Sequence, residues 1–524
     1  MAVLKTNEQG EIISRNKATG EELARVPSMT EEQARSAVDR ARAAQPVWAA
    51  QTSEVRERII LRFRDLLIDR AEEIAELISK ENGKTLQEAI EMEILPVADL
   101  CTYFAKNVRD ILTPKSIRLH LLKHRGSYLH YKPRGVVLVI SPWNFPFSIA
   151  HGEIVMSLLA GNTVVHKPAS LTPLIALKGA ELLQLAGLPA GALEVVTAPG
   201  AVASRMIDMG VNYVNFTGSV PVGQRVSEAC GRNMIPCSLE LGGKDPLVVC
   251  ADADLERAAN AIVWGAFANS GQVCASVERV YAVAPIYDQL VEKVVAKTRR
   301  LRQGDPLSPD TDVGAMTDPG QLDAVERQVA DAVAKGARVL AGGKRREGPG
   351  LFFEPTVLVD VNDQMDVIRE ETFGPVVPLV KVDSEEEAIR RSNDSEFGLN
   401  AYVFTKDRER GRRIAERLEA GTVMVNEVLT THAAPETPWG GVKKSGMGRV
   451  HSDDGLRALC ETYHVNYDRI PSLARDPFWY PYSGKMYRGL VRAMRLLFRS
   501  GMRAKWDALF GRGAPPNGRP HASP

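Results

Sequence analysis

Residues 213–223 have the sequence YVNFTGSVPVG, in which an apolar strand ends at Phe216 and a helix follows a few residues later. Gly218 and Ser219 lie between them, and Gly223 follows within the predicted first turn of the helix. A glycine-containing turn from a strand into a helix presents backbone N–H groups to a phosphate. The same turn also serves simply to join a strand to a helix, so this segment alone leaves both interpretations open.

Short, continuous apolar runs recur on both sides of this segment, which is typical of buried parallel strands. Helical patterns separate them, and this alternation predicts an open α/β sheet. A second series begins after Gly243, where we place a domain boundary. The first series comprises 135–140, 163–166, 193–197 and 213–216, the second begins with 246–249 and 279–283, and helices are expected at 30–49, 54–79 (one or two) and 174–186.

Length and composition set broad limits. At 524 residues the chain exceeds one hydrophobic core, so two or three domains are expected. The formal net charge of +1 gives no general attraction to nucleic acid. The polar segment 1–15 lacks the apolar region of a signal peptide, and no apolar run would span a membrane. We therefore expect a cytoplasmic protein.

The six cysteines form no C-x-x-C pair and match no zinc pattern, so no metal is expected. A lone cysteine is most often a small buried apolar residue. Cys274 differs because it ends the segment ANSGQVC, residues 268–274, whose polar and glycine residues are poor core material. A thiolate there would be a strong nucleophile if a base is near.

Five further glycine- or proline-containing segments could each be an ordinary loop. Glu240, which begins one of them, could equally be a solvated carboxylate at a loop tip. These segments are SPWNFP (141–146), AGNTVVHKP (160–168), ELGGKDP (240–246), EETFGPV (370–376) and PWGGVKKSGMGR (438–449).

Taken together with FTGSVPVG and GQVC, these segments resemble, in order and spacing, the aldehyde dehydrogenase superfamily. The resemblance covers roughly residues 16–466. Within the superfamily, CASVERVY (274–281) and PFWYPYS (477–483) are similar to a branch that contains diapolycopene-dialdehyde and other lipophilic-aldehyde dehydrogenases.

The resemblance implies an α/β fold, with a Rossmann-like cofactor domain, an α/β catalytic domain and a β-hairpin for oligomerisation. The basic, alternating stretch 118–132 predicts that hairpin, with its turn at Arg125-Gly126. A homodimer or homotetramer is implied. The expected parts are the NAD(P)-binding domain at 1–113 and 134–241, oligomerisation strands at 114–133 and 460–468, the catalytic domain at 242–427, a return segment at 428–459 and a basic tail at 469–524.

The implied reaction is oxidation of an aldehyde to a carboxylic acid. Cys274 attacks the carbonyl carbon, and the Asn144 side chain and the Cys274 backbone N–H stabilise the oxyanion. Hydride transfer to the nicotinamide leaves a thioester, which Glu240 hydrolyses by activating water. The aldehyde is expected to be medium- or long-chain, or otherwise lipophilic.

The implied cofactor is NAD or NADP. Ser219 and the turn after Gly218 would meet the pyrophosphate, Lys167 the adenosine ribose, and Glu371 the nicotinamide ribose. NAD-preferring members usually carry a glutamate where this chain has Ser170, and a serine would not repel a 2′-phosphate. The complete set expected to bind the cofactor is Ser141, Trp143, Lys167, Ser170, Gly218, Ser219, Gly223, Leu241, Glu371 and Phe373.

Two other functions are weighed. In an acylating dehydrogenase coenzyme A would receive the acyl group, but such enzymes generally lack the base at Glu240. A catalytically idle member with a binding or structural role would not need Cys274, Glu240 and Asn144 together. The product formed, and the appearance of NADH, would distinguish these alternatives.

The C-terminal tail has its own pattern. From Pro477 to Trp506 there are seven basic residues and no acidic ones. Apolar residues from Met486 to Met502 recur mostly every three or four positions, with arginines opposite, which predicts one amphipathic helix. Such a helix suits the inner membrane surface, with peripheral contact through 477–510, or docking on a neighbouring subunit; periodicity leaves both open.

Overall fold

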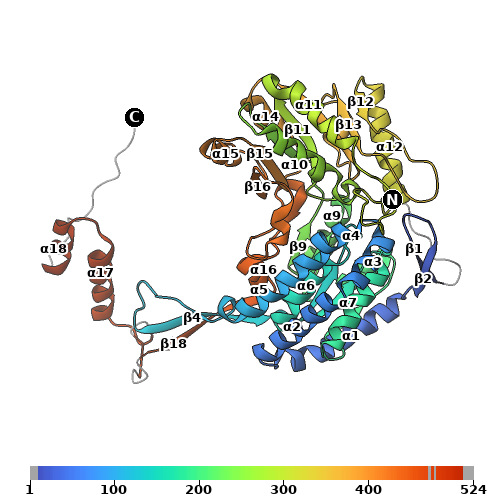
Figure 1. The fold of residues 1–524 in the computed structure, drawn as a ribbon. Coiled ribbons are helices and arrows are strands. Elements are labelled where there is room, and N and C mark those ends of the chain that lie inside the picture. The colour runs from blue at the N-terminus through green and yellow to red at the C-terminus, as the bar shows by residue number, and fades with distance from the viewer. Residues whose placement is uncertain (1–9, 470–473, 477–478, 511–524) are drawn as a thin grey trace. The chain divides into compact units, whose positions relative to one another are not determined.

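The computed structural model describes residues 10–469, 474–476 and 479–510. The chain divides into two compact units, one of residues 1–115 and 129–464 and the other of 116–128 and 465–524 (Figure 1).

A six-stranded sheet organises the first half of the larger unit. It is parallel except for its edge strand β17. Alternate residues point to opposite faces, so Val137 and Val139 pack into one hydrophobic cluster and Val136 and Leu138 into another. The strand order is β17 (Gly446–Met447), β9 (Cys237–Glu240), β8 (Tyr213–Thr217), β5 (Val136–Ile140), β6 (Thr163–Lys167) and β7 (Leu193–Val195).

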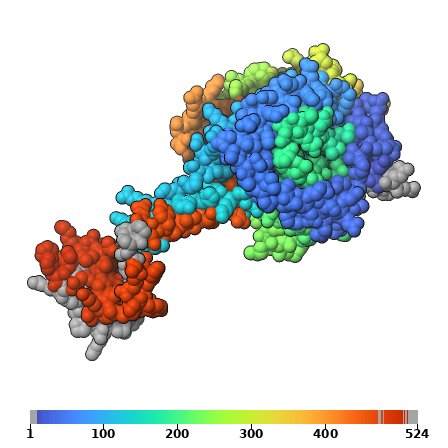
Figure 2. All heavy atoms as spheres, turned by 90° about the horizontal axis from the view of Figure 1, so that it is seen from below, coloured from blue at the N-terminus to red at the C-terminus, as the bar shows by residue number. Residues whose placement is uncertain are grey.

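Helices cover both faces of this sheet. In Figure 2 the N-terminal helices, coloured blue, form a closely packed layer. One cluster is completed by α1 (Glu31–Ala49), α8 (Gly200–Met206) and α9 (Val220–Arg232). The other is completed by α2 (Ser53–Asp69), α3 (Ala71–Asn82), α5 (Leu95–Ile111), α6 (Ser148–Leu159) and α7 (Pro173–Leu185).

A seven-stranded sheet organises the second half and is parallel except for β12. Helices again cover both faces. The strand order is β12 (Arg338–Ala341), β13 (Thr356–Val359), β14 (Val376–Val382), β11 (Val277–Val283), β10 (Asp245–Val249), β15 (Asn400–Phe404) and β16 (Thr422–Val425). One face carries α10 (Leu255–Phe267) and α11 (Ala284–Thr298), and the other α12 (Pro319–Ala334), α13 (Asp366–Arg369), α14 (Glu385–Asn393) and α15 (Arg408–Ala415).

Shorter elements connect these layers. They are β1 (Glu11–Arg15) and β2 (Glu22–Pro27), which pair antiparallel, α4 (Leu86–Ala89), the π-helical turn η1 (Ile90–Ile94), η2 (Ile207–Met209), η3 (Ala268–Gly271), η4 (Thr430–Ala433), η5 (Lys443–Ser445) and α16 (Ser452–Ala458). A separate three-stranded sheet has the order β18 (Cys460–Asp468), β4 (Arg125–Pro133) and β3 (Lys115–Ser116).

The secondary structure predicted from the sequence for the two sheets is confirmed. Each apolar run forms a strand, and 54–79 forms two helices. Helix α1 begins with a capping box: the Thr30 side chain accepts from the Gln33 backbone N–H, and the Gln33 side chain accepts from the Thr30 backbone N–H.

The predicted hairpin turn at Arg125-Gly126 is wrong. Both residues lie inside the long strand β4, and its partner β3 is only two residues long. Gly126 has a packing reason instead: a Cβ there would lie 2.1 Å from the ring of Tyr467 on β18. The glycine therefore allows an aromatic side chain to lie against the strand.

The predicted continuous helical face from Met486 to Met502 is also wrong. Helix α17 (Gly484–Phe498) ends before Gly501, which has φ 95°, and Met502 begins a second helix, α18 (Met502–Phe510). The C-cap residue Arg499 has an extended backbone, which ends α17, and Gly501 in the link to α18 adopts the left-handed conformation that glycine tolerates best. Among the described residues, no helix is both long and apolar enough to cross a membrane.

Candidate active site

Cys274 follows an unusual loop between α10 and β11. Asn269, Ser270 and Gly271 all adopt left-handed backbone conformations, with φ of 50°, 55° and 70°. A Cβ on Gly271 would lie 2.1 Å from the carbonyl oxygen of Gly374, so only glycine fits. Two strained non-glycine residues in succession persist only where surrounding contacts hold them.

Buried hydrogen bonds hold this loop. The Ser270 hydroxyl donates to the carbonyl of Gly314 (2.9 Å), and the Gln272 amide donates to the carbonyl of Asn269 (2.9 Å). The Thr317 backbone N–H donates to the Gln272 side-chain oxygen (2.8 Å). The position of Cys274 is therefore fixed before any ligand binds.

The surroundings of the Cys274 thiol are apolar and include several buried carboxyl groups. It is one of two cysteines that are not fully buried, the other being Cys237. Burial raises the pKa of Cys274, and the carboxylates of Glu371, Asp245 and Glu240 raise it further. The free thiol is thus protonated at neutral pH, and forming the thiolate requires a base.

Hydrogen bonds fix both the backbone and the side chain of Asn144, and the side chain contacts the loop that precedes Cys274. Its amide nitrogen donates to the carbonyl of Gln272 (3.0 Å), which leaves its second N–H for a ligand. The backbone carbonyl of Asn144 accepts from Lys84 Nζ (2.9 Å) and from the side-chain amide of Asn269 (2.9 Å). The donor expected to stabilise the oxyanion is therefore preorganised.

A fully buried ion pair supports the segment around Asn144. Lys84 Nζ and Glu93 Oε1 are 2.6 Å apart, with neither side chain exposed. The other oxygen of Glu93 accepts from the N–H groups of Phe147 and Ser148, where α6 begins. Glu93 lies in the π-helical turn η1, and such turns frequently occur at functional sites.

Glu240 is the last residue of β9 and is buried, which excludes the solvated loop tip considered from the sequence. Neither carboxylate oxygen has a hydrogen-bond partner in the described part of the chain. Its pKa is raised well above the usual value by burial and then by Glu153, while Arg449 and the Trp439 side chain lower it. A buried carboxyl with a raised pKa suits a general base near neutral pH.

Glu371 also lies close to the Cys274 loop. Its Oε1 accepts from the backbone N–H of Gly243 (2.9 Å), and a Cβ on Gly242 would meet its Oε2 at 2.4 Å. Burial and then Glu278 raise the pKa of Glu371 to about 8. Gly242 of ELGGKDP is thus required for the close approach of this carboxyl, and Gly243 for the close approach of the Cys274 carbonyl oxygen, 2.3 Å from where a Cβ would lie.

A second buried ion pair positions the segment that carries Phe373. Lys244 Nζ contacts Glu278, whose carboxylate accepts from the N–H groups of Thr372 and Phe373. Phe373 has φ 48°, and its ring meets Trp143 edge-on with 5.4 Å between ring centroids. Two aromatic residues expected at the cofactor site are therefore brought together.

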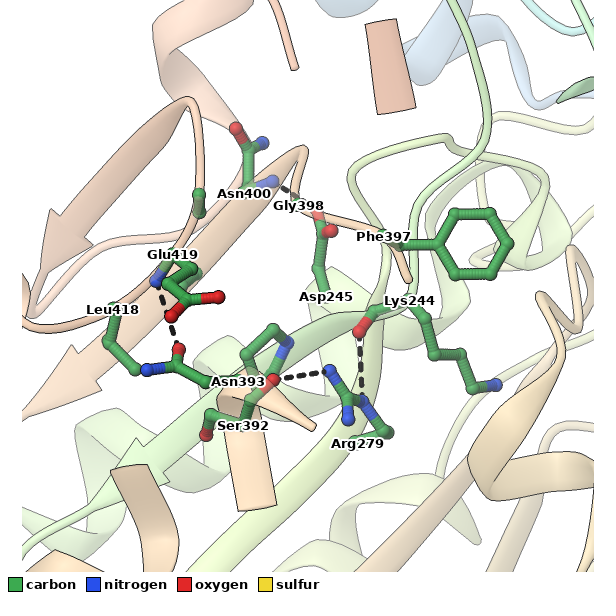
Figure 3. A pocket seen from close by; sticks show the side chains of 13 residues that line it. Lys244, Asp245, Arg279, Ser392, Asn393, Phe397, Gly398, Asn400, Leu418 and Glu419 are labelled. Atoms are coloured by element: carbon green, nitrogen blue, oxygen red, sulfur yellow. Dashed lines mark hydrogen bonds between the residues drawn. The ribbon is translucent and has the colours of Figure 1, made fainter. Parts of the chain in front are cut away.

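Arg279 binds the backbone of ELGGKDP, and both line a shallow pocket (Figure 3). The Arg279 guanidinium donates to the carbonyls of Lys244 (2.9 Å) and Ser392 (3.1 Å). Asp245 accepts from the backbone N–H of Asn400 (3.0 Å). Arg279 and Asp245 are thus engaged with protein groups and support the backbone of the active site.

The residues expected to bind the cofactor phosphates lie at the start of α9. Ser219 is its N-terminal cap residue, yet its hydroxyl makes no cap bond and has no partner. Gly223 packs against Leu241, since a Cβ there would lie 2.4 Å from the leucine side chain. An unused buried hydroxyl at a helix N-terminus fits an anionic ligand.

The residues expected near the adenosine lie at and just after the ends of parallel strands. Lys167 ends β6, and burial lowers its pKa to about 8, with no carboxylate opposing that shift. Ser170 follows three residues later, with its hydroxyl 3.5 Å from the carbonyl of Ala198. Ser141 bonds to His166 (2.8 Å), so its hydroxyl is already engaged inside the sheet.

Several supporting residues were not identified from the sequence. Asn269 and Gln272 lie in the quoted segment 268–274 but were given no role, and the Lys84–Glu93 pair was not considered. The sequence signal that could have indicated this pair was Lys84 in the glycine-containing segment 81–85, followed by Glu93. Such residues are normally solvated, and only burial in the fold distinguishes these.

Comparisons with known proteins agree with this geometry. The family model described as "Aldehyde dehydrogenase family" matches residues 4–465. A succinate-semialdehyde dehydrogenase (NADP(+)) of Escherichia coli is 38% identical, over 86% of this chain and 93% of that protein.

Solved structures show the same fold. A structure titled as an E. coli NADP dependent enzyme superposes with a TM-score of 0.84 at 36% identity, covering 88% of this chain and 95% of that one. The NAD+ complex of an aldehyde dehydrogenase from Bacillus cereus gives 0.84 at 33% identity, covering 88% and 94%.

The chain belongs to the aldehyde dehydrogenase family and has its α/β fold. It is an NAD(P)-dependent oxidoreductase that acts on a small-molecule aldehyde.

Proposed function

We propose that this enzyme oxidises a medium- or long-chain, or otherwise lipophilic, aldehyde to the free carboxylic acid, with Cys274 as nucleophile. The proposed substrate class rests on the hydrophobic surroundings of Cys274. Its side chain packs against a hydrophobic cluster that includes Phe145, Leu429 and Trp439, and partly buried Met92 borders the same cluster.

The charges at this site favour an uncharged substrate. The three charged side chains that act most strongly on the Cys274 thiol are all carboxyl groups. The two buried lysines nearby in the fold, Lys84 and Lys244, are already paired with Glu93 and Glu278. Burial raises the pKa of all three carboxyl groups. A substrate carboxylate would therefore find no free lysine partner among these groups, and burying its unpaired charge would cost free energy.

The proposed chemistry uses three side chains. Glu240 removes the thiol proton, and the Cys274 sulfur bonds to the carbonyl carbon to give a thiohemiacetal. The free N–H of Asn144 and the Cys274 backbone N–H stabilise the oxyanion. Glu240 then releases the thiol proton to solvent. After oxidation it takes a proton from water, and the hydroxide oxygen bonds to the thioester carbon. The carbon–sulfur bond breaks to release the acid, and Glu240 returns its proton to the Cys274 thiolate.

The residues present fit NAD or NADP. The unpartnered Ser219 hydroxyl and the start of α9 would hold the pyrophosphate, Lys167 the adenosine ribose, and Glu371 the nicotinamide ribose beside Phe373 and Trp143. When bound, the nicotinamide accepts the hydride. Ser170 supports NADP as well as NAD, because it places no negative charge at the ribose.

A substrate scan tests the substrate class. We expect kcat/KM to rise from propanal to decanal and to exceed the value for succinate semialdehyde, with acid and not acyl-coenzyme A as product. Each substrate is measured with both cofactors, and the product is identified by mass spectrometry. A preference for succinate semialdehyde would contradict the proposed substrate class, and acyl-coenzyme A would contradict the hydrolytic role of Glu240.

We further propose that the tail brings the enzyme to an anionic lipid surface at the inner face of the membrane. Leu490, Met494, Leu497 and Phe498 on α17 are between 43% and 60% exposed. The opposite side of this helix carries only basic charge, from Lys485, Arg488, Arg492 and Arg495. Each such cation contributes about 1 kcal/mol near anionic headgroups, and the apolar side chains would enter the interface.

Sedimentation with liposomes tests this tail. The full-length enzyme should sediment with phosphatidylglycerol-containing vesicles and much less with phosphatidylcholine alone. A variant with Leu490, Met494 and Leu497 changed to serine, and a chain truncated after Asp476, should both remain in the supernatant. Equal partitioning of all three proteins would exclude the tail as the anchor, and a larger assembly formed only by the full-length chain would indicate docking between subunits.

A homodimer or homotetramer is the proposed assembly, through 114–133 and 460–468. The strands β18 and β3 form the two edges of their three-stranded sheet, and an unpaired edge can add a strand from another chain. Light scattering measures the assembly directly. A monomer at micromolar concentration would contradict this proposal.

A further inference from the structure

We propose that Glu153 is a positioning residue for the Glu240 base, a second buried carboxyl whose charge sets the pH at which the enzyme releases acid. The proposal rests on the proposed role of Glu240.

Strand register places the two carboxyls on one side of the six-stranded sheet. Leu239 and Leu241 pack into the cluster of α1, α8 and α9, so Glu240 between them faces the side of α6. On the neighbouring strand β8, Asn215 pairs with Ser238, two residues before Glu240, and so faces the same side. The Asn215 amide donates to Glu153 of α6 (2.5 Å).

Within the described residues, neither carboxyl group of this pair contacts a basic side chain directly. Both carboxyl groups are buried, and neither takes part in any ion pair of the described residues. Asn215 is the only hydrogen-bond partner found for Glu153 in the same part of the chain, and Glu240 has none. Two uncompensated carboxyls that interact cannot both ionise easily, so they titrate as a pair.

Other titratable groups around Glu153 do not change charge in the working pH range. Burial lowers the pKa of His151 to about 4 and of His451 to about 3, and the pKa of His166 lies well below its usual value. Burial raises the pKa of Tyr213 to about 12.

The remaining charges are fixed by partners or constant. On η1, Glu93 is paired with Lys84, and on α2 Arg56 bonds the carbonyl of Leu159 at the end of α6. Arg449, which acts on Glu240, stays positive. The pKa of Glu153 itself is raised to about 8 by burial, which Asn215 only partly offsets. Glu153 is thus the one neighbour of Glu240 among these groups whose charge changes between about pH 7 and 9.

The sign of the effect follows. An ionised Glu153 stabilises the protonated, inactive form of Glu240, so a higher pH is needed to create the base. Removing the charge should let Glu240 ionise at lower pH. The measurable consequence is a shift of the acidic limb of the pH–rate profile.

Ester hydrolysis without cofactor measures this limb, because an acylated Cys274 formed from p-nitrophenyl acetate must also be hydrolysed. For Glu153→Gln, and for Glu153→Met in case the first variant does not fold, we expect the acidic limb to move down by about one pH unit or more. Below that limb the variant should be about tenfold or more faster than the unmodified enzyme. Glu81→Gln removes another buried carboxyl, held at the start of α7, and should leave the limb in place.

Two outcomes would overturn the inference. If Glu153→Gln and Glu153→Met lower the rate uniformly with an unshifted limb, Glu153 has only a structural role. If Glu81→Gln shifts the limb equally, the effect is general. Failure of the base itself is distinguishable, because Glu240→Gln would then hydrolyse the ester at the normal rate.

Discussion

Replacing Glu93 by glutamine tests whether the buried Lys84–Glu93 pair organises the active site. Glutamine keeps the shape but removes the charge, and its side chain has one acceptor and one donor group. Glu93 now accepts from Lys84 with one oxygen and from the N–H groups of Phe147 and Ser148 with the other. In the variant, the glutamine NH2 group must face either the Lys84 ammonium or the N–H groups of Phe147 and Ser148, so two donors meet.

The expected loss follows from the burial of both partners. Breaking a fully buried pair costs about 3–5 kcal/mol, because the remaining charge is left without a partner. For a unit of 150–250 residues this corresponds to about 2–4 °C per kcal/mol, so the first thermal transition should fall by about 6–20 °C. Because Lys84 Nζ also holds the carbonyl of Asn144, kcat should fall more than KM changes.

Differential scanning calorimetry and steady-state kinetics measure the two effects. Lys84→Met combined with Glu93→Gln should recover part of the lost stability, since no buried charge then remains unpaired. Catalysis should not recover, because the double variant lacks the Lys84 amino group that donates to the Asn144 backbone carbonyl. A single variant that melts within about 2 °C of the unmodified enzyme would refute this reasoning.

Other predictions concern the catalytic and cofactor residues. Cys274→Ala should abolish aldehyde oxidation but leave NAD(P)+ binding nearly intact by calorimetry; retained turnover would exclude Cys274 as nucleophile. Glu240→Gln should give a pre-steady-state burst of NADH followed by slow turnover, and unchanged steady-state turnover would remove its role in hydrolysis. Ser170→Glu should shift preference from NADP toward NAD by about 1–4 kcal/mol, from repulsion between close negative charges; an unchanged ratio of the two kcat/KM values would exclude Ser170 as discriminator. Glu153 has a pKa raised from 4.5 to about 8 in the fold, so its proton is held by the folded state and its contribution to stability is lost as pH rises from about 4.5 to 8. The melting temperature of Glu153→Gln minus that of the unmodified enzyme should therefore become more positive over this range, and a flat difference would contradict the shift.

The candidate site was largely predictable because its residues lie in short segments whose order is visible in the chain. Cys274 stood out by its glycine and amide neighbours, and Ser219 by a strand-to-helix turn. The supporting residues were not predictable. Lys84 and Glu93 are ordinary surface types in sequence, and only packing removes them from water.

The two errors in secondary structure have a common cause. A glycine in the sequence at 126 or within 499–502 has several meanings, since it permits a turn, a helix end or close packing. At Gly126 the deciding fact is the Tyr467 ring, which is distant in sequence. Near Gly501 the deciding facts are the extended backbone of Arg499, which ends α17, and the left-handed backbone of Gly501 in the link to α18.

The sequence by itself determined the class of sheet and the order of strands along the chain, because apolar runs and their spacing reflect burial directly. It also singled out Cys274 and Glu240 as the proposed nucleophile and base. Only the tertiary structure decided what surrounds them: the strained loop before Cys274, the buried ion pairs behind it and the carboxyl of Glu153 beside Glu240. These depend on contacts between residues far apart in the chain, and burial, which changes the energy of each charge, exists only once the chain has folded.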